Sequence, residues 1–467
     1  MRRRPLLMLL LVMALVAAAC GGGDEETGGG DASEGGGGGG GEGGGPITFW
    51  STENLDDRVA VQREIISAFT EETGIEVELN AVAEDELPNL MIANAASGDL
   101  PDVVFHGLDF AAGWAEQGLI DPDAANAVVE ELGRDTFSTP ALELATIDDQ
   151  VVSVPADGWG QLLVYRTDLF EEAGLEPPDT FERIQAAAEA LHDPDNNMSG
   201  ITLATDPADV FTQQTFEALA LANGCQMVDD GGEVTLGSPQ CAEAIEFFST
   251  LVNDYSPGGA QTVDTTRATY FAGQAAMIIW SPFILDEMAG LRNDALPTCP
   301  ECEDDPTFLA QNSGLIGAIS GGGAEPAQYG QVSYFGIGAN ADVESAQEFI
   351  RYLLTDGYVD WLSMAPEGKF PMRPGTAEEP ETYVTQWQDL EAGVDEKAPL
   401  SDNYGQEVID RLQEGVNNFD RWGFGQGAGE QVSRLYETLA VPQALNEVVQ
   451  GGLTPQEAAE QLASEVE

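Results

Sequence analysis

Residues 47–105 read ITFWSTENLDDRVAVQREIISAFTEETGIEVELNAVAEDELPNLMIANAASGDLPDVVF, and this stretch decides the predicted fold. Apolar residues recur at helical spacing between Arg58 and Glu72, and the short apolar runs on either side have the length and alternation of strands. Gly74 follows the first helical segment as a C-cap. The order strand, helix, strand, helix, strand predicts an α/β layer with parallel strands, in which ligands bind beyond the carboxyl ends of the strands.

Segments of both kinds continue through the rest of the chain, without an internal repeat. Further strands are predicted at 151–154, 161–165, 276–280, 315–319 and 332–337. Further helices are predicted up to Leu191, from Ser238-Pro239, over 343–355 and from the capping box Thr454-Pro455-Gln456-Glu457.

The N-terminal segment has the pattern of an export signal. Arg2, Arg3 and Arg4 precede an apolar run over 6–19, which is too short to span a bilayer. Ala17-Ala18-Ala19-Cys20 resembles a bacterial lipobox, which predicts cleavage and lipidation at Cys20; ordinary cleavage that leaves a free cysteine is the alternative. The arginines also fit a twin-arginine signal, so the export route stays open.

Residues 21–45 are mostly glycine with a few acids, a composition that cannot bury a core and forms a flexible coil. Together, the signal (1–20) and this tether predict a protein held by a lipid at the extracellular face of the cell membrane. The remaining residues, 46–467, are long enough for two lobes.

The chain is strongly acidic, with 82 Asp and Glu against 17 Lys and Arg and a formal net charge of −65. Nucleic acid is excluded as a partner, because its binding needs clustered Lys and Arg. Such a charge also strains a folded chain unless salt screens it, which predicts a high-salt habitat; the alternative is that the charge serves solubility alone.

Four cysteines follow Cys20, and an even number in an exported chain favours disulfides. Cys225 and Cys241 flank a predicted hairpin over 227–236 and would close it, and Cys299 with Cys302 would then form a second small loop; three pairings are open. With a single C-x-x-C and two histidines, neither a zinc site nor any other metal or cofactor is predicted.

Several segments resemble, in order and spacing, the family 1 extracellular solute-binding proteins of ABC importers, the maltose-binding-protein-like group that takes up carbohydrates. These segments are SGDLPDVV at 97–104, WAEQGLI at 114–120, LVYRTDLF at 163–170, AGLEPPDTF at 173–181, FAGQAAM at 271–277, SPF at 281–283 and FPMR at 370–373.

The resemblance implies a two-lobed, type II periplasmic-binding-protein-like fold with the ligand in a cleft between the lobes. Lobe 1 would comprise 46–156 with 325–371, and lobe 2 would comprise 157–324 with 372–467. The implied protein is a monomer that closes on a small molecule, most simply a sugar, and delivers it to the permease subunits. The ATPase must be another chain, since this one has no G-x-x-x-x-G-K-[ST] motif.

The first candidate ligand-binding residues follow strands in the N-terminal third. Trp50, Ser51 and Glu53 follow the first strand, and Asp109 follows the strand 103–105, where the resemblance implies ligand contacts. Trp159 stands where the family carries a ligand-contacting glutamate, so that a stacking indole would replace a carboxylate. The alternative for each is a packed aromatic or a solvated acid.

The remaining candidates are spread along the chain. Gln214 stands where relatives carry a stacking aromatic, which puts a long linear oligosaccharide in doubt. Trp422 belongs to RWGFG at 421–425, which is predicted to be an aromatic surface loop. The other candidates are Trp280, Ser281, Phe283 and Tyr334, with His106, Asp157, Gln161 and Gln213 as weaker neighbours.

Three readings stay open beside a sugar-binding protein. HDPDNN at 192–197 invites a calcium loop but lacks the glycine and final glutamate of an EF-hand, which favours a plain turn. Paired acids could serve a secreted glycoside-active enzyme, although the abundance of acids makes a pair uninformative. Tryptophans and acids would also suit a cationic or zwitterionic osmolyte or a polyamine.

Overall fold

The structure is a computed structural model that describes residues 45–84 and 86–466. The predicted export signal, Cys20 and the tether up to residue 44 lie outside the described residues. Within the described ranges, no helix is both long enough and apolar enough to cross a membrane.

The N-terminal unit has the predicted alternation of strands and helices. Its elements are β1 (Ile47–Ser51), α1 (Asp56–Thr73), β2 (Val77–Ala81), α2 (Leu87–Ser97) and β3 (Val103–Gly107). β1 pairs in parallel with both β2 and β3, as predicted. α1 ends at Gly74, whose φ of 79° is left-handed and whose N–H donates to the Thr70 carbonyl, so this predicted C-cap is confirmed.

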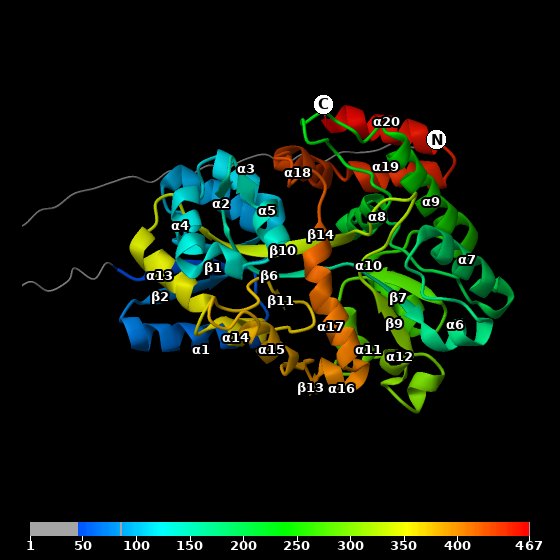
Figure 1. Ribbon diagram of the computed structural model, residues 1–467, viewed down its shortest axis with the longest axis horizontal. Helices are drawn as coiled ribbons and strands as arrows, with labels where there is room; N and C mark the ends of the chain where they lie inside the picture. Colours follow the sequence, from blue (N-terminus) through cyan, green and yellow to red (C-terminus); the bar gives the residue numbers. More distant parts are fainter. Residues whose placement is uncertain (1–44, 85, 467) are drawn as a thin grey trace, which may run out of the picture. The chain divides into compact units, whose positions relative to one another are not determined.

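A large sheet has the strand order β11-β6-β10-β3-β1-β2, and β14 pairs with β10. The added strands are β6 (Val154–Gly160), β10 (Gln328–Ile337), β11 (Phe370–Pro371) and β14 (Phe419–Asp420). β10 is antiparallel to both β3 and β6, so the sheet is mixed rather than wholly parallel. Figure 1 shows β6 and β10 running side by side through the middle of the molecule.

A small sheet has the order β8-β7-β9, with strands β7 (Leu162–Arg166), β8 (Met277–Trp280) and β9 (Ser313–Ile316). Gln161 alone separates β6 from β7, so one residue carries the chain from the large sheet into the small one. The chain returns between β9 and β10 (Figure 1).

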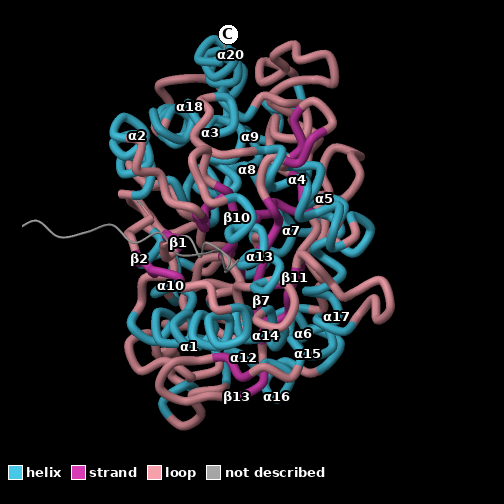
Figure 2. Tube along the Cα trace, turned by 90° about the vertical axis from the view of Figure 1, so that its left-hand side faces the viewer, coloured by secondary structure: helices cyan, strands magenta, loops and turns pink. Residues whose placement is uncertain are grey.

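Helices cover both sheets. The large sheet contacts α3 (Leu108–Glu116), α4 (Pro122–Leu132) and α13 (Val343–Leu353), and α14 (Tyr358–Leu362) packs on α1. α8 (Val210–Ala222) contacts β10 and packs on α9 (Pro239–Tyr255) and α19 (Ala440–Val449), and α9 in turn contacts α7 (Phe181–Leu191) and α20 (Pro455–Val466). The small sheet is contacted by α6 (Thr167–Ala173) and α10 (Val263–Phe271). α18 (Gly429–Thr438) contacts α3 on one side and α19 and α20 on the other, and Figure 2 shows it beside α3.

The remaining elements are short. They are α5 (Thr139–Leu144), α11 (Ile284–Met288), α12 (Phe308–Gln311), α15 (Thr382–Gln388), α16 (Leu400–Tyr404), α17 (Gln406–Gly415), β4 (Thr146–Ile147), β5 (Gln150–Val151), β12 (Glu391–Ala392) and β13 (Ala398–Pro399).

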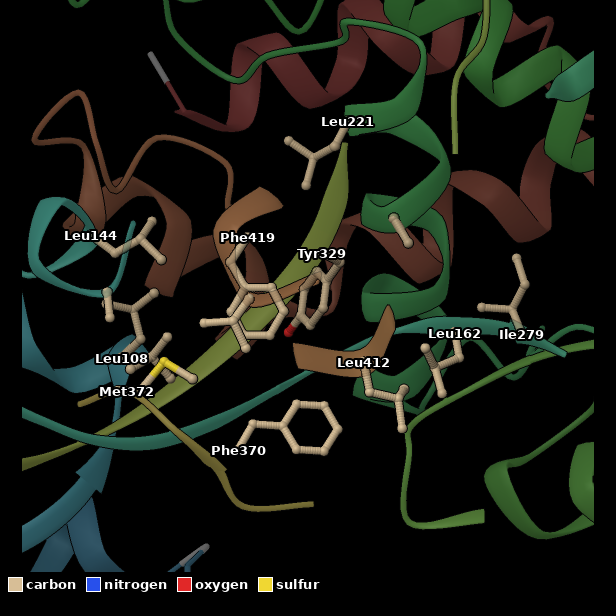
Figure 3. Close-up of a cluster of buried hydrophobic side chains, with 14 of the residues drawn as sticks. Leu108, Leu144, Leu162, Leu221, Ile279, Tyr329, Phe370, Met372, Leu412 and Phe419 are labelled. Carbon is tan, nitrogen blue, oxygen red and sulfur yellow. The ribbon is translucent and has the colours of Figure 1, made fainter. Parts of the chain in front are cut away.

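One buried apolar cluster runs through both sheets. In Figure 3, Tyr329 and Phe419 lie between Leu108, beside the large sheet, and Leu162 of the small sheet. Gly330 permits this packing, because a Cβ there would lie 2.2 Å from a ring carbon of Phe419. The two sheets therefore share a core at the point where the chain crosses between them.

The four cysteines form two disulfides in the structure. Cys225 pairs with Cys241, and the segment between them turns back on itself through a bridge between Val228 and Val234. Cys299 pairs with Cys302. Of the three pairings open to the sequence, the structure has the one that closes each local loop.

Candidate functional site

A cavity of about 610 Å³ lies between α2 and α3 on one side and α18 with the start of α8 on the other. Its apolar walls include Phe110, whose ring stacks on Trp114 with centroids 5.1 Å apart. Ile92 and Val210, also in the walls, are 58% and 46% exposed. Large apolar side chains so exposed around a cavity are surfaces that a ligand would cover.

Asp109 is the predicted site residue that lines this cavity. It lies in the first turn of α3, where the helix dipole favours a carboxylate. Oδ1 accepts a hydrogen bond from Arg421 Nη2 at 3.0 Å, and Oδ2 accepts one from Gln331 Nε2 at 2.9 Å. The side chain keeps 26% of its surface exposed, and a carboxylate can accept more hydrogen bonds than these two.

Arg421 is fully buried behind Asp109. Its Nε donates to Glu217 Oε1 at 2.9 Å, Nη1 donates to Gln331 Oε1, and Nη2 lies 3.2 Å from the Tyr436 hydroxyl. Its guanidinium carbon lies 4.5 Å from the centre of the Tyr329 ring. A buried arginine held by two carboxylates and an aromatic face is charge-compensated and rigid.

Tyr436, on α18, lines the same cavity as Asp109. Its hydroxyl donates to Glu217 Oε2 at 2.8 Å. Burial raises the pKa of Tyr436 well above its usual value, although Arg421 acts in the opposite direction, so the phenol stays protonated.

Trp159 and Phe283 form an aromatic group beside this network. Trp159 is half-buried on β6 and pairs across the ladder with Gln331, the residue that also bonds Asp109. The Trp159 ring lies 6.0 Å from Tyr329 and 6.4 Å from Phe283. Gln331 on β10 therefore links Trp159 to Asp109. A partly exposed indole at this position can cover an apolar ring face of a ligand.

Three other predicted residues lie beyond the crossover, in the predicted lobe 2. Trp280 is half-buried, its ring lies 4.7 Å from Phe211, and its buried Nε1 has no hydrogen-bond partner. Gln214 on α8 is half-buried, whereas its neighbour Gln213 is fully buried with both amide atoms unpartnered. Ser281 is buried at the turn that leads into α11.

The candidates at the end of β1 and directly after it have structural partners. Trp50 is half-buried and packs against the small apolar cluster that includes Trp114. Ser51 is buried, and its hydroxyl accepts from the Glu53 backbone N–H. Glu53 is buried and ion-paired to Arg58 at 2.7 Å and to Lys369 at 2.5 Å. Burial works to raise the pKa of Glu53, but the two cations outweigh it and the pKa is lowered.

Two candidates lie inside the core. Tyr334 is fully buried, and its hydroxyl donates to the Ala141 carbonyl at 2.8 Å. The predicted surface loop at 421–425 is wrong, because Trp422 is fully buried and its Nε1 donates to the Cys225 carbonyl at 2.8 Å. The disulfide-closed segment supplies that acceptor, which no local pattern around Trp422 indicates.

The weaker neighbours are also bound within the fold. His106 is fully buried between Gly107 O and Ser153 Oγ, and burial lowers its pKa to about 4. Asp157 accepts from Trp361 Nε1 at 2.7 Å and pairs with Lys369. Gln161 is buried at the crossover, and its side-chain amide has no hydrogen-bond partner.

The segment 193–198 forms the predicted turn, with a short 3₁₀ helix over Pro194–Asn196 and Asn197 in a left-handed conformation. Within the described ranges, the acids, histidines and cysteines form no group of three or more that could hold a metal ion.

Sequence reasoning missed most of the buried network. Glu217, Gln331 and Tyr436 stand in stretches with no distinguishing motif. Arg421 could have been found from its residue type alone, because a basic side chain is rare in a chain with 17 Lys and Arg against 82 acids. A rare arginine beside buried aromatics is a reasonable candidate for a buried ion pair.

Comparison with known proteins identifies relatives along most of the chain. The model of the bacterial extracellular solute-binding protein family matches residues 52–360. The Escherichia coli K12 protein YcjN, whose name places it among ABC transporter periplasmic-binding proteins, is 28% identical over 333 residues, or 70% of this chain and 73% of that protein. The maltotriose-binding protein of Pyrococcus abyssi is 22% identical over 311 residues, or 66% and 62% of the two chains. The mannitol-binding protein of Pseudomonas aeruginosa is 24% identical over 237 residues, or 49% and 53%.

Solved structures share the fold over nearly the whole chain. The cyclic α-maltosyl-1,6-maltose binding protein of Arthrobacter globiformis superposes with a TM-score of 0.68 at 18% identity, covering 90% of this chain and 98% of that one. Maltose-bound MalE3 of Thermotoga maritima gives 0.66 at 17% identity, covering 91% and 99%. The predicted two-lobed α/β fold is thus confirmed, and the chain belongs to the bacterial extracellular solute-binding protein family.

Proposed function

We propose that this chain is the extracellular substrate-binding lipoprotein of an ABC importer, and that it captures a sugar, polyol or oligosaccharide for the permease subunits. The observation that carries the proposal is the cavity that Asp109 of α3 and Tyr436 of α18 line together. A carboxylate and a phenol can bond hydroxyl groups while the aromatic walls cover apolar ring faces. The names of the maltotriose-binding and mannitol-binding relatives support this ligand class.

The proposed ligand-binding set keeps Asp109, Trp159, Gln214, Trp280 and Phe283 and adds Tyr436 and Phe110. The first five come from both sides of the crossover, and Tyr436 and Phe110 line the cavity with Asp109. Trp50, Ser51, Glu53, Ser281, Tyr334 and Trp422 are placed outside this set, because their described partners belong to the fold. We assign no catalytic role to the chain.

The proposed lobes are 46–156 with 325–371 and 157–324 with 372–467. These boundaries fall within β6, shortly before β10 and directly after β11, which are strands of the large sheet near the crossover. The proposed anchor is a lipid on Cys20, and the protein would act as a monomer. Replacement of Cys20 by Ala should release the protein into the medium, and light scattering of the released protein should give the monomer mass.

A thermal-shift screen in high salt tests the ligand class. Maltotriose, D-mannitol and related sugars and polyols should raise the melting temperature and be recovered unchanged. Turnover of the sugar would indicate an enzyme instead. Glycine betaine and spermidine test the second candidate, a cationic or zwitterionic solute, which is favoured by Asp109, Glu430 and Glu437 in the cavity wall against Arg434 alone.

Variants locate the site. Asp109→Ala and Trp159→Ala should each weaken binding about tenfold or more, because each removes a directed contact. Asp254→Ala, at an exposed position near the end of α9, is the matched control and should bind like the wild type. Wild-type affinity of Asp109→Ala would exclude this cavity as the ligand site, and wild-type affinity of Trp159→Ala would exclude Trp159 from the ligand-binding set.

A further inference from the structure

Arg421 joins four elements that are distant in sequence. It contacts Asp109 at the start of α3, Gln331 on β10, Glu217 on α8 and Tyr436 on α18. Four of its five N–H groups have an acceptor within the described residues, and the side chain is fully buried. Such an arginine is held in one position by every element around it.

Two of these partners line the cavity, which sets Arg421 apart from an ordinary buried ion pair. Asp109 and Tyr436 both lie within hydrogen-bond distance of the same nitrogen, Nη2, at 3.0 and 3.2 Å. Both residues also line the cavity, Asp109 from α3 and Tyr436 from α18. A single buried nitrogen therefore sets the positions of two of the polar groups in the cavity wall.

The remaining partners hold that nitrogen in place. Glu217 accepts from Arg421 Nε and also from the Tyr436 hydroxyl. The Tyr436 hydroxyl therefore bonds both members of the Arg421–Glu217 ion pair. Gln331 accepts from Nη1 and donates to Asp109 Oδ2, so Asp109 is fixed in the same way. The Ser433 hydroxyl donates to the Asp109 carbonyl at 2.8 Å, which ties α18 directly to α3.

We propose that Arg421 is a positioning residue for the ligand, because it holds Asp109 and Tyr436 together as one hydrogen-bonding wall of the cavity. It thereby couples the contact between the ligand and α3 to the position of α18 against α3. The inference rests on the proposed function, because it takes this cavity as the ligand site. The wall accepts through Asp109, whose ionised oxygens are acceptors only, so it favours a ligand that donates O–H groups. Preorganisation of this kind raises affinity because less side-chain freedom is lost on binding.

A double-mutant cycle on ligand affinity tests the coupling, with maltotriose and D-mannitol as the first probes. Arg421→Lys and Asp109→Asn should each weaken binding about tenfold or more. The affinity of the double variant should be about equal to that of the single variant that binds less tightly. Additive losses, near a hundredfold in the double variant, would overturn the positioning role. Unchanged affinity of the folded Arg421→Lys protein would do the same.

A second cycle avoids dependence on the folding of an arginine variant. Tyr436→Phe keeps Arg421 and removes only the hydroxyl, and it should weaken binding about threefold to tenfold, mainly through faster release. Together with Asp109→Asn, its effect should again be less than additive. Full additivity in this cycle would contradict a shared wall.

Arg373 provides the matched control, since it is a second buried arginine that lies outside the cavity. It donates to the Leu354 and Leu132 carbonyls and to Thr136 Oγ1. Arg373→Lys should lower the melting temperature and leave ligand affinity unchanged. Absence of binding by the wild-type protein to every sugar and polyol would overturn the proposed function itself, which separates that failure from failure of the positioning role.

Discussion

Lys369 is one of only two lysines in the chain, and the structure uses it in the interior. Its ammonium lies 2.5 Å from Glu53 Oε1 and 3.2 Å from Asp157 Oδ2, and 4.9 Å from the ring centres of Phe105 and Trp361. Burial raises the pKa of Asp157, while Lys369 opposes this increase. One cation therefore compensates two buried acids.

We predict that Lys369→Met lowers the free energy of unfolding by about 3–5 kcal/mol, because it leaves buried carboxylates without their cation. The control is Lys397→Met, since Lys397 is exposed and its loss should change the free energy by less than about 0.5 kcal/mol. Urea unfolding at neutral pH measures both. Equal stabilities of the two variants would show that Lys369 is dispensable.

At the scale of elements, α11 packs against the loop that precedes β11. A Cβ on Gly368 would clash with the Phe283 ring, so the two segments are in close contact. Three buried acids lie in this region, and burial is the main cause that raises the pKa of Asp286 to about 6, of Glu287 to about 7 and of Glu367 to about 8. Glu287 lies 2.6 Å from Arg267, but burial outweighs that ion pair.

This contact predicts that stability falls as the pH rises from about 5 to 9. An acid whose pKa is raised in the folded state binds its proton more tightly there than in the unfolded chain, so its stabilising contribution is complete below the ordinary carboxyl pKa and is lost as the pH passes through 6 to 8. Glu367→Gln should flatten the decline of the melting temperature. Glu243→Gln, at an exposed position on α9, should retain it; parallel wild-type and Glu367→Gln profiles would contradict the assignment.

At the scale of the whole molecule, the formal net charge of −65 dominates. Ion pairs such as those of Arg421 and Lys369 neutralise only local acids, and the 82 carboxylate residues far exceed the 17 basic ones. The excess repels itself over distances that dilute salt does not screen.

We expect the melting temperature to rise steadily with NaCl up to at least 1 M, because the screening length falls from about 8 Å at physiological ionic strength to about 3 Å. Sucrose at matched osmolality provides the control for general solvent effects and should raise it less. A melting temperature that is flat or falls with NaCl would leave solubility as the sole role of the charge.

Local signals predicted much of the fold. The first helix and its Gly74 cap follow from apolar spacing and one glycine, and the final helix begins at the predicted capping box, in which Thr454 and Glu457 bond each other's backbone N–H groups. Thr180 caps α7 by accepting a hydrogen bond from the Arg183 backbone N–H. These interactions join residues a few positions apart, so a short window of sequence contains all of them.

By itself, the amino-acid sequence determined the order of strands and helices, the family resemblance and the position of Asp109 after the third strand. Only the tertiary structure decided that Asp109 meets Arg421, 312 residues further on, that Glu53 belongs to Lys369, and that Trp422 is buried. The physical reason is range: helix periodicity and caps act between neighbours, whereas a buried ion pair forms only when distant elements pack. With 82 acids along the chain, no local rule could select the two that share Arg421.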